Sequence, residues 1–240
     1  MKIAVSIYGQ PRNFETGYEY LSKSLKEYDV DYFIHSWFDQ SEVGKNLIIY
    51  SDKKGVVSDA IKEGTREKIL KLYRPKDYII EKQIEFPEIP ELLNNHGRPP
   101  DATIPTNIFQ SMLYSRKTSI DLMYHYPVNY DICIATRTDV ATTKNFIPDI
   151  IDDSIYSGYC RGDIWHKEAL TCGIIASTQE NIHHYGKLYD EYMNIYDSGV
   201  SYCAHRMAFE HMKKLEKRFK FILKDDWYWV RKNGLVPAFY

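Results

Sequence analysis

YDICIATRTDV, residues 130–140, is the stretch of the chain that decides the fold. It predicts a short apolar β-strand that runs directly into Arg137, Thr138 and Asp139. A strand that ends in a cation and a carboxylate places both charges at the rim of a sheet, and open α/β folds bind their ligands at that rim. The stretch therefore predicts an α/β sheet with a functional site where this strand ends.

Apolar and helical patterns alternate through the first half of the chain and become mixed later, which predicts a mixed sheet flanked by helices. The expected strands are residues 3–8, 30–35, 78–81, 130–136, 155–159, 171–176, 219–223 and 228–230. The expected helices are residues 15–28, 58–73, 106–125, with Thr106 as N-cap, 179–196 and 202–217. Residues 85–105 hold five of the ten prolines and are expected to form an irregular loop.

Length, charge and cysteine spacing favour a single-domain cytoplasmic protein that does not bind nucleic acid. A chain of 240 residues with 44% hydrophobic residues can bury a full core, so one domain is expected. The formal net charge of -2 gives no basic field, so no nucleic-acid partner is expected. The four cysteines show no CxxC spacing, which favours reduced thiols in a cytoplasmic protein. The apolar run at the N-terminus breaks at Gly9, so neither a signal peptide nor a membrane span is expected.

The turn after the first strand, SIYGQPR at residues 6–12, is a candidate phosphate-binding turn. Gly9 lets the backbone turn tightly, Gln10 follows it, and Arg12 offers a planar, permanently charged donor. A plain β-to-α turn with a solvated arginine is the alternative, because neither a Rossmann fingerprint nor a P-loop is present.

The second strand is expected to end in HSWFD, residues 35–39, beside that turn. Trp37 could stack on a base or sugar, and His35 or Asp39 could bond hydroxyl groups. A core tryptophan with a helix-capping Asp39 explains the same residues.

Arg137 and Asp139 lie two residues apart on an extended strand and point the same way, so they could form an ion pair. The competing interpretation is that Asp139 coordinates Mn²⁺ or Mg²⁺ while Arg137 contacts a phosphate or sugar.

Two further groups of side chains are candidates. On the helix expected at 106–125, Gln110, Tyr114 and Lys117 share one face that could border a binding pocket. In the loop 161–168, Asp163 is the candidate base for deprotonating a hydroxyl group. A solvated helix face and a solvated polar loop are the alternatives.

With these residues laid out, the chain resembles the GT-A glycosyltransferases, particularly short bacterial and viral enzymes of surface-polysaccharide synthesis. Four landmarks carry the resemblance in this order: SIYGQPR, FIHSWFD at 33–39, NIFQSMLYSRK at 107–117, and YDICIATRTDV.

The resemblance implies a single GT-A-like, Rossmann-like domain over residues 1–240, with a nucleotide-sugar donor half at 1–140 and an acceptor half at 141–240. It also implies transfer of a sugar from a nucleotide-sugar donor to a hydroxyl of a glycan or lipid-linked acceptor. In such enzymes a metal ion holds the diphosphate at a D-x-D motif. Arg137 stands where the first acid of that motif would be, and Asp139 matches its last acid, the one that usually meets the metal. Metal assistance is therefore still expected, while Arg137 could itself neutralise part of the leaving diphosphate and weaken the dependence on the metal.

Residues 206–232 carry nine Lys and Arg against four acids, interleaved with aromatic residues. They could rest on an anionic membrane surface beside a lipid-linked acceptor, or form an ordinary solvated helix and hairpin. The other functions left open are a nucleotide-sugar hydrolase, a nucleotidyltransferase and a non-catalytic sugar-binding module.

Overall fold

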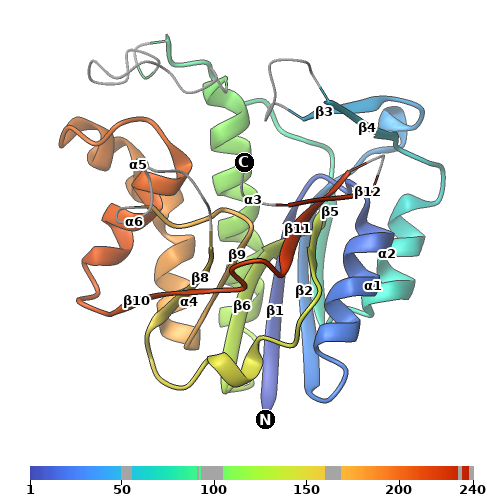
Figure 1. Ribbon diagram of the computed structural model, residues 1–240. Helices are drawn as coiled ribbons and strands as arrows, with labels where there is room; N and C mark the ends of the chain where they lie inside the picture. The colour runs from blue at the N-terminus through green and yellow to red at the C-terminus, as the bar shows by residue number, and fades with distance from the viewer. Residues whose placement is uncertain (50–55, 91, 93–104, 160–168, 232–233, 238–240) are drawn as a thin grey trace.

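The computed structural model describes residues 1–49, 56–90, 92, 105–159, 169–231 and 234–237. Its centre is a seven-stranded sheet in the order β10-β8-β9-β6-β1-β2-β5 (Figure 1). The strands are β1 (Lys2–Gly9), β2 (Asp29–Trp37), β5 (Asp77–Glu81), β6 (Ile132–Arg137), β8 (Ile155–Gly158), β9 (Ile174–Ser177) and β10 (Phe219–Ile222). The predicted fold class, a mixed α/β sheet flanked by helices in a single domain, is confirmed.

Parallel and antiparallel pairs divide this sheet as the sequence predicts. β1 pairs in parallel with β2 and with β6, and β2 pairs in parallel with β5. β9 runs antiparallel to both β6 and β8, and β10 is parallel to β8. The early βαβ alternation therefore builds the parallel half, and the later strands extend it with an antiparallel insertion.

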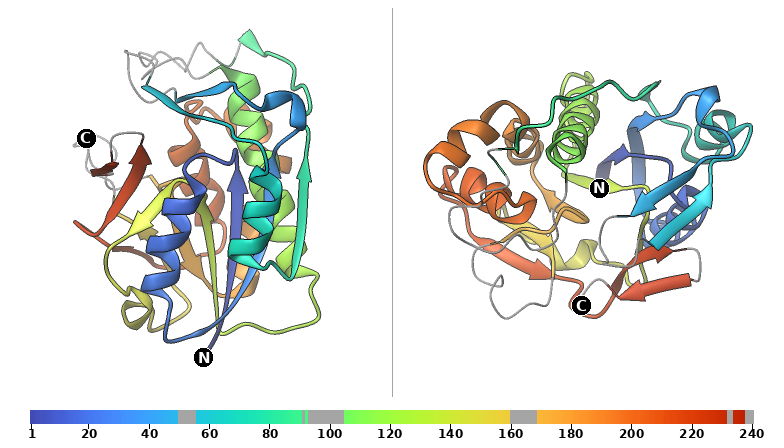
Figure 2. Two further views of the ribbon diagram at one scale, coloured as in Figure 1. Left: turned by 90° about the vertical axis from the view of Figure 1, so that its right-hand side faces the viewer. Right: turned by 90° about the horizontal axis from the view of Figure 1, so that it is seen from above.

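Helices cover both faces of the sheet (Figure 2). On one face lie α1 (Phe14–Ser24) and α2 (Thr65–Tyr73), and on the other lie α3 (Thr106–Tyr124), α4 (Gln179–Gly186), α5 (Leu188–Asp197) and α6 (Ala204–Lys213). Side chains of β1 alternate between two cores, since Val5 and Ile7 pack with α1 and α2 while Ala4 and Tyr8 pack on the α3 side. This period of two explains why the strand reads as continuously apolar in the sequence.

Two small sheets flank the central one. β7 (Val140–Thr142) pairs antiparallel with β11 (Trp227–Arg231), which also pairs with β12 (Gly234–Pro237). β3 (Asn46–Ile49) and β4 (Val56–Ala60) form a separate antiparallel pair. The single-turn 3-10 helices Gln40–Glu42 and Ile147–Asp149 complete the described elements. Among the described residues, no helix is long and apolar enough to span a membrane.

Three expected helices differ from the structure. The segment 58–73 begins in β4 and becomes helical only at Thr65, because Gly64 takes a left-handed conformation at φ 72° and separates the two elements. The segment 179–196 is two helices that meet at Lys187. Thr106 is the first residue of α3 and not its N-cap, and its hydroxyl accepts a hydrogen bond from the Ile89 amide instead.

The order of strands fixes where a ligand site belongs. The chain runs from β1 outward through β2 to β5, and then returns to the other side of β1 with β6. The connecting helices also change faces, from α1 and α2 to α3. The carboxyl ends of β1 and β6 are therefore the topological switch point, the place where open α/β sheets leave a crevice.

Gly17 of α1 allows that helix to lie directly on the turn after β6. A Cβ atom at this position would overlap the carbonyl oxygen of Thr138 and approach that of Val140 at 3.4 Å. Only a residue without a side chain lets the helix come this near, so Gly17 sets the distance between α1 and the end of β6.

We expect Gly17→Ala to lower the free energy of unfolding by about 1–3 kcal/mol, because helix and turn must separate to admit the methyl group. Urea unfolding measures this. The control is Glu19→Ala, an exposed residue of the same helix, with an expected change within about 0.5 kcal/mol. Equal stability of the two variants would show that α1 does not press on the turn.

His184 of α4 and His211 of α6 join these two helices by a reciprocal contact. The His211 Nε2 atom lies 2.8 Å from the His184 carbonyl oxygen, the His184 Nε2 atom lies 3.3 Å from the His211 carbonyl oxygen, and the rings stack at 4.2 Å. Burial lowers the pKa of His211 to about 4, with the hydrogen bond to His184 opposing and nearby Lys214 adding to the shift. Burial outweighs these contacts with carbonyl oxygens at both rings, so the pair favours the neutral imidazoles.

This contact predicts a loss of stability in acid. Between pH 6.5 and about 4 the unfolded chain takes up a proton at His211 that the folded chain does not, so the free energy of unfolding falls with the pH. Unfolding of the wild type and of His211→Gln at pH 7.5 and pH 5 tests this. The difference between them should shrink at pH 5, and His125→Gln, at an exposed histidine, should show no such change. A pH-independent difference for His211→Gln would contradict it.

Candidate functional site

The candidate site lies at the carboxyl ends of β1 and β6. Arg137, the last residue of β6, is paired with Tyr8 in the register of the sheet. The chain after β1 turns at Gly9, whose φ of 107° is open only to glycine at low cost. The Thr138 hydroxyl donates to the Gln10 carbonyl at 2.7 Å, which fastens the two strand ends together.

Asp139 is the centre of this site, and its side chain is fully buried. Arg137 binds it with two parallel hydrogen bonds, Nε to Oδ1 and Nη2 to Oδ2, both at 2.9 Å. Arg231 of β11 donates to the same Oδ2 from Nη1 at 3.2 Å. The ion pair between Arg137 and Asp139, one of the two interpretations open from the sequence, is thus present, and Arg231 was not foreseen.

The electrostatics follow from this geometry. Burial alone would raise the pKa of Asp139, but the charges of Arg137, Arg231 and Arg12 outweigh it and hold that pKa below its usual value. Burial would likewise lower the pKa of Arg137, and the carboxylate more than compensates. The site therefore stays fully charged at neutral pH.

The guanidinium groups of Arg137 and Arg231 both lie over the ring of Trp229 in β11. The Cζ atom of Arg137 lies 4.8 Å from the ring centroid and that of Arg231 lies 5.2 Å from it. β11 is itself held here by the backbone, since the Val230 amide donates to the Asp139 carbonyl at 2.8 Å. We call Arg12, Arg137, Asp139, Trp229 and Arg231 the Asp139 cluster.

Arg12 enters the cluster from the turn after β1. Its guanidinium donates to the Gln10 side chain, and its charge acts on Asp139. Asn13, in a left-handed conformation at φ 46°, donates from its side chain to the Val230 carbonyl at 2.9 Å. The turn SIYGQPR is therefore built into the site, and its arginine is not a solvated surface residue.

His35, from β2, is buried next to this turn and does not reach the cluster. Its Nδ1 atom lies 2.7 Å from the Ser115 hydroxyl and its Nε2 atom lies 3.1 Å from Glu81. Ser115 also accepts a hydrogen bond from the Gly9 amide at 2.8 Å. Burial lowers the pKa of His35, with Glu81 opposing the shift. The histidine thus positions the Gly9 turn through Ser115, a residue that the sequence analysis missed.

Trp37 packs in an aromatic group and is only 4% exposed. Tyr114 of α3 stacks on it at 5.5 Å, and Phe86 approaches its edge at 6.4 Å. Asp39 caps the short helix that follows, accepting from the Ser41 amide at 2.9 Å. The alternative of a core tryptophan with a capping aspartate is what the structure shows.

The face of α3 predicted to border the pocket serves other contacts. Gln110 is buried and donates to the Pro87 carbonyl at 2.8 Å, which ties down the segment after β5. Lys117 pairs with Asp121 at 2.8 Å and lies 3.9 Å from Asp190 of α5. The structure therefore places Lys117 among acids, away from the Asp139 cluster. Asp163, the candidate base, lies outside the described residues.

A metal ion does not fit at Asp139 as the residues are arranged. Both carboxylate oxygens already accept hydrogen bonds from guanidinium groups, so Mn²⁺ or Mg²⁺ there would meet positive charge within hydrogen-bond distance. In the described part of the chain, no group of three or more His, Cys, Asp or Glu side chains could hold a metal. In this structure the carboxylate of Asp139 orients arginines, and its assignment as a metal ligand stays a prediction from the sequence.

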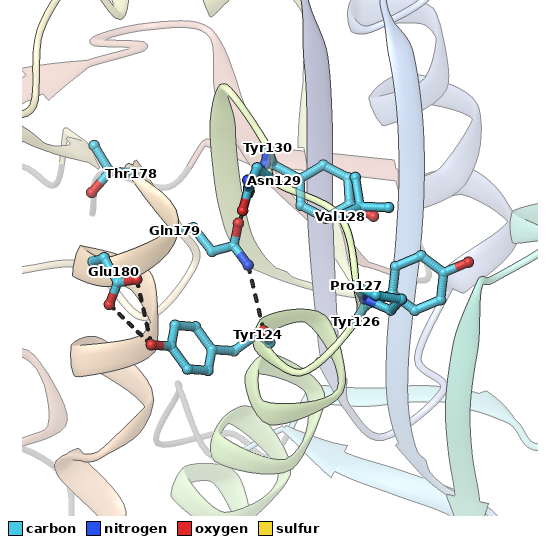
Figure 3. Close-up of a pocket in the computed structure, with 9 residues that line it drawn as sticks. All are labelled: Tyr124, Tyr126, Pro127, Val128, Asn129, Tyr130, Thr178, Gln179 and Glu180. Atoms are coloured by element: carbon cyan, nitrogen blue, oxygen red, sulfur yellow. Dashed lines mark hydrogen bonds between the residues drawn. The ribbon is translucent and has the colours of Figure 1, made fainter.

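A pocket lies at the opposite end of the sheet, where β6 begins (Figure 3). Its volume is about 530 Å³, and its lining includes Tyr124, Tyr130 and Gln179. Tyr124 donates to Glu180 at 3.1 Å across its floor. The described residues that line it include no arginine or lysine, so its chemistry does not suit a phosphate. Charge and topology both favour the Asp139 cluster over this hollow.

The lysines of segment 206–232 are largely paired with acids. Lys213 pairs with Glu210, Lys214 with Glu191, Lys217 with Asp153, and Lys220 with Asp152. Three of these acids lie outside the segment, so the positive excess at this surface is smaller than the sequence count suggests.

No protein-family model matches the chain, and no curated protein matches it significantly. Similar solved structures include the galactosyltransferase LgtC in complex with donor and acceptor sugar analogs, at 11% identity and a TM-score of 0.47, covering 91% of this chain and 73% of that one. Mouse xyloside xylosyltransferase 1 is similar at 10% identity and a TM-score of 0.44, covering 92% of this chain and 84% of that one.

Both neighbours are sugar transferases by name. Identities and scores this low leave the function of this chain to be argued from its own site.

The cluster predicts a large effect of neutralising Asp139. Asp139→Asn removes a fully buried charge that two partly buried arginines share, so we expect the free energy of unfolding to fall by about 3–5 kcal/mol. Chemical denaturation at pH 7 measures it. Asp225→Asn, at an exposed aspartate, is the control and should change stability by no more than about 0.5 kcal/mol. If Asp139→Asn changed the free energy of unfolding only slightly, solvent and not Asp139 would be compensating the positive charge of the two arginines.

Proposed function

We propose that this protein is a glycosyltransferase that moves a sugar from a nucleoside-diphosphate sugar to a hydroxyl of a glycan or lipid-linked acceptor. The observation that carries the proposal is the Asp139 cluster, in which three guanidinium groups surround a single carboxylate at the topological switch point. The cluster holds an excess of positive charge at the strand ends, where a phosphate-bearing ligand would bind.

Arg137 is the residue best placed to touch the diphosphate. Two of its nitrogens are committed to Asp139, which fixes the guanidinium plane, and its side chain keeps 19% of its surface exposed. A planar guanidinium held in this way binds phosphate oxygens with little loss of freedom. Arg137 is therefore the proposed catalytic residue, and Asp139 is a positioning residue.

The chemistry requires such a group. Breaking the bond between the sugar and the phosphate leaves an extra negative charge on the diphosphate, and fixed cations beside it lower the barrier. Arg137, with Arg12 and Arg231 behind it, supplies this charge in the proposal, in place of the metal that the resemblance implies. The acceptor hydroxyl then attacks the sugar and must lose its proton, and Asp163 stays a prediction for that base.

The proposal joins the two halves of the chain at one site. Arg12 and Arg137 come from the predicted donor half, 1–140, and Arg231 comes from the predicted acceptor half, 141–240. Gly9 and Gln10 form the backbone edge of the donor site, and His35 supports it through Ser115. The proposal gives no contact with the donor to four residues that pack against other parts of the fold: Trp37, Gln110, Tyr114 and Lys117. A cytoplasmic location and contact of 206–232 with an anionic membrane stay predictions, the second testable by liposome co-sedimentation.

A donor panel tests the function. Incubation with UDP-, GDP-, CMP- and TDP-sugars should give a thermal shift and nucleotide release with at least one diphosphate donor, and release should persist in EDTA. Binding without release would favour a sugar-binding module, and release with no acceptor dependence would favour a hydrolase. Loss of all turnover in EDTA with recovery in Mn²⁺ would refute the arginine-only account of charge stabilisation.

Arg137 variants test the site itself. We expect Arg137→Gln to lower kcat/KM for the active donor about 100-fold or more, because glutamine has neither the positive charge nor the paired N–H donors that bind phosphate oxygens. Arg137→Lys should recover part of this, because it keeps the charge but not the two-pronged geometry. Arg66→Gln is the matched control, an exposed arginine on α2. Wild-type turnover by folded Arg137→Gln would rule out the assignment.

A further inference from the structure

Cys172 lies at the edge of the candidate site, in the segment that precedes β9. The Tyr8 hydroxyl donates to the Cys172 carbonyl at 2.6 Å, and the neighbouring Gly173 carbonyl accepts from Thr136 of β6 at 2.9 Å. These two bonds hold the residue against the ends of β1 and β6. Its side chain is partly exposed, whereas Cys133, inside β6, is buried.

The thiol of Cys172 contacts an imidazole. Its Sγ atom lies 3.5 Å from the Nε2 atom of His205, in the first turn of α6. A thiol next to a histidine can pass its proton to the ring, leaving a thiolate beside an imidazolium.

The guanidinium group of Arg116, on α3, would also stabilise a negative charge on the Cys172 sulfur. Its side chain is fully buried, and none of its three guanidinium nitrogens has a hydrogen-bond partner among the residues that the structure describes. The guanidinium stacks on Tyr185, with Cζ 3.8 Å from the ring centroid. A buried cation without a counter-ion is costly, and the Cys172 sulfur is a group within its electrostatic reach that can become an anion.

The positive charges around the Cys172 sulfur all lower the pKa of its thiol. Burial raises the pKa of Cys172, but the charge and hydrogen bond of His205 and the charges of Arg137 and Arg116 outweigh it and bring the pKa to about 7. In the described part of the chain, the other titratable groups that face the thiol are Tyr8 and Tyr185, whose own pKa values burial raises, so both stay neutral. Burial without such partners raises the pKa of Cys133.

We propose that Cys172 is a thiolate at neutral pH and the position at which soft electrophiles modify this protein, beside the diphosphate site. In the reaction with iodoacetamide the sulfur lone pair forms a bond to the methylene carbon and iodide leaves, so no oxidant is needed. This inference does not depend on the identity of the donor or on turnover.

Competitive labelling tests it on the full native chain. Limiting iodoacetamide is applied from pH 5.5 to pH 9, and trypsin then releases each of the four cysteines in a separate peptide for mass spectrometry. Cys203, also partly exposed, is the control within the same molecule. We expect the Cys172 rate to level off above pH 7 and to exceed that of Cys203 about threefold or more at pH 7, allowing for the weaker nucleophilicity of a low-pKa thiolate.

His205→Gln separates a thiolate from a merely accessible thiol. Loss of the imidazole should move the midpoint of the Cys172 profile upward, toward the ordinary value near 8.5, while the Cys203 profile stays unchanged. An unchanged Cys203 profile also shows that the variant is folded. If the variant does not fold, the labelling profile of the wild type alone decides the test. A wild-type midpoint near 8.5, or one that His205→Gln does not move, would overturn the proposal.

Discussion

The carboxylate of Asp139 holds together three segments that are far apart in the chain. Its oxygens accept hydrogen bonds from Arg137 at the end of β6 and from Arg231 on β11, and its charge faces Arg12 in the turn after β1. A fully buried carboxylate is stable only when such partners surround it. The position of β11, the closing of the first turn and the direction of Arg137 all depend on this one charge.

This arrangement changes how a phosphate-bearing ligand would be held. A D-x-D motif offers acids to a metal, whereas here the first acid is replaced by Arg137 and the second is used to orient it. Fixed guanidinium groups can neutralise a leaving diphosphate directly and need no reorganisation during the reaction. The same positive field reaches Cys172, where it favours a thiolate, so one group of charges explains both the proposed chemistry and the proposed reactivity.

The strongest sequence patterns predicted the frame of the molecule. Apolar runs located β1, β2 and β6, and the pattern around Arg137 and Asp139 placed these two residues at the end of β6, where the structure has them. Local periodicity could not find β7 or β12, because each is short and exists only through pairing with β11. It also could not find Arg231, which reaches Asp139 from 92 positions away.

The functions of single side chains were harder to predict than the fold. Lys117 and Gln110 do share a face of α3, but neighbouring Asp121 and the Pro87 carbonyl engage them first. Trp37 had the right chemistry for stacking on a ligand and is instead covered by Tyr114. Ser115 carries no signal in the sequence, since a serine inside a helix is ordinary until the fold brings Gly9 and His35 to it.

The central claim is that a nucleoside diphosphate binds at the Asp139 cluster. A crystal structure of the protein with the nucleoside diphosphate of its preferred donor tests this most directly. The account predicts phosphate oxygens within about 3.2 Å of the Arg137 guanidinium, at the carboxyl ends of β1 and β6. A diphosphate bound in the hollow lined by Tyr124 and Gln179, at the other end of the sheet, would contradict it.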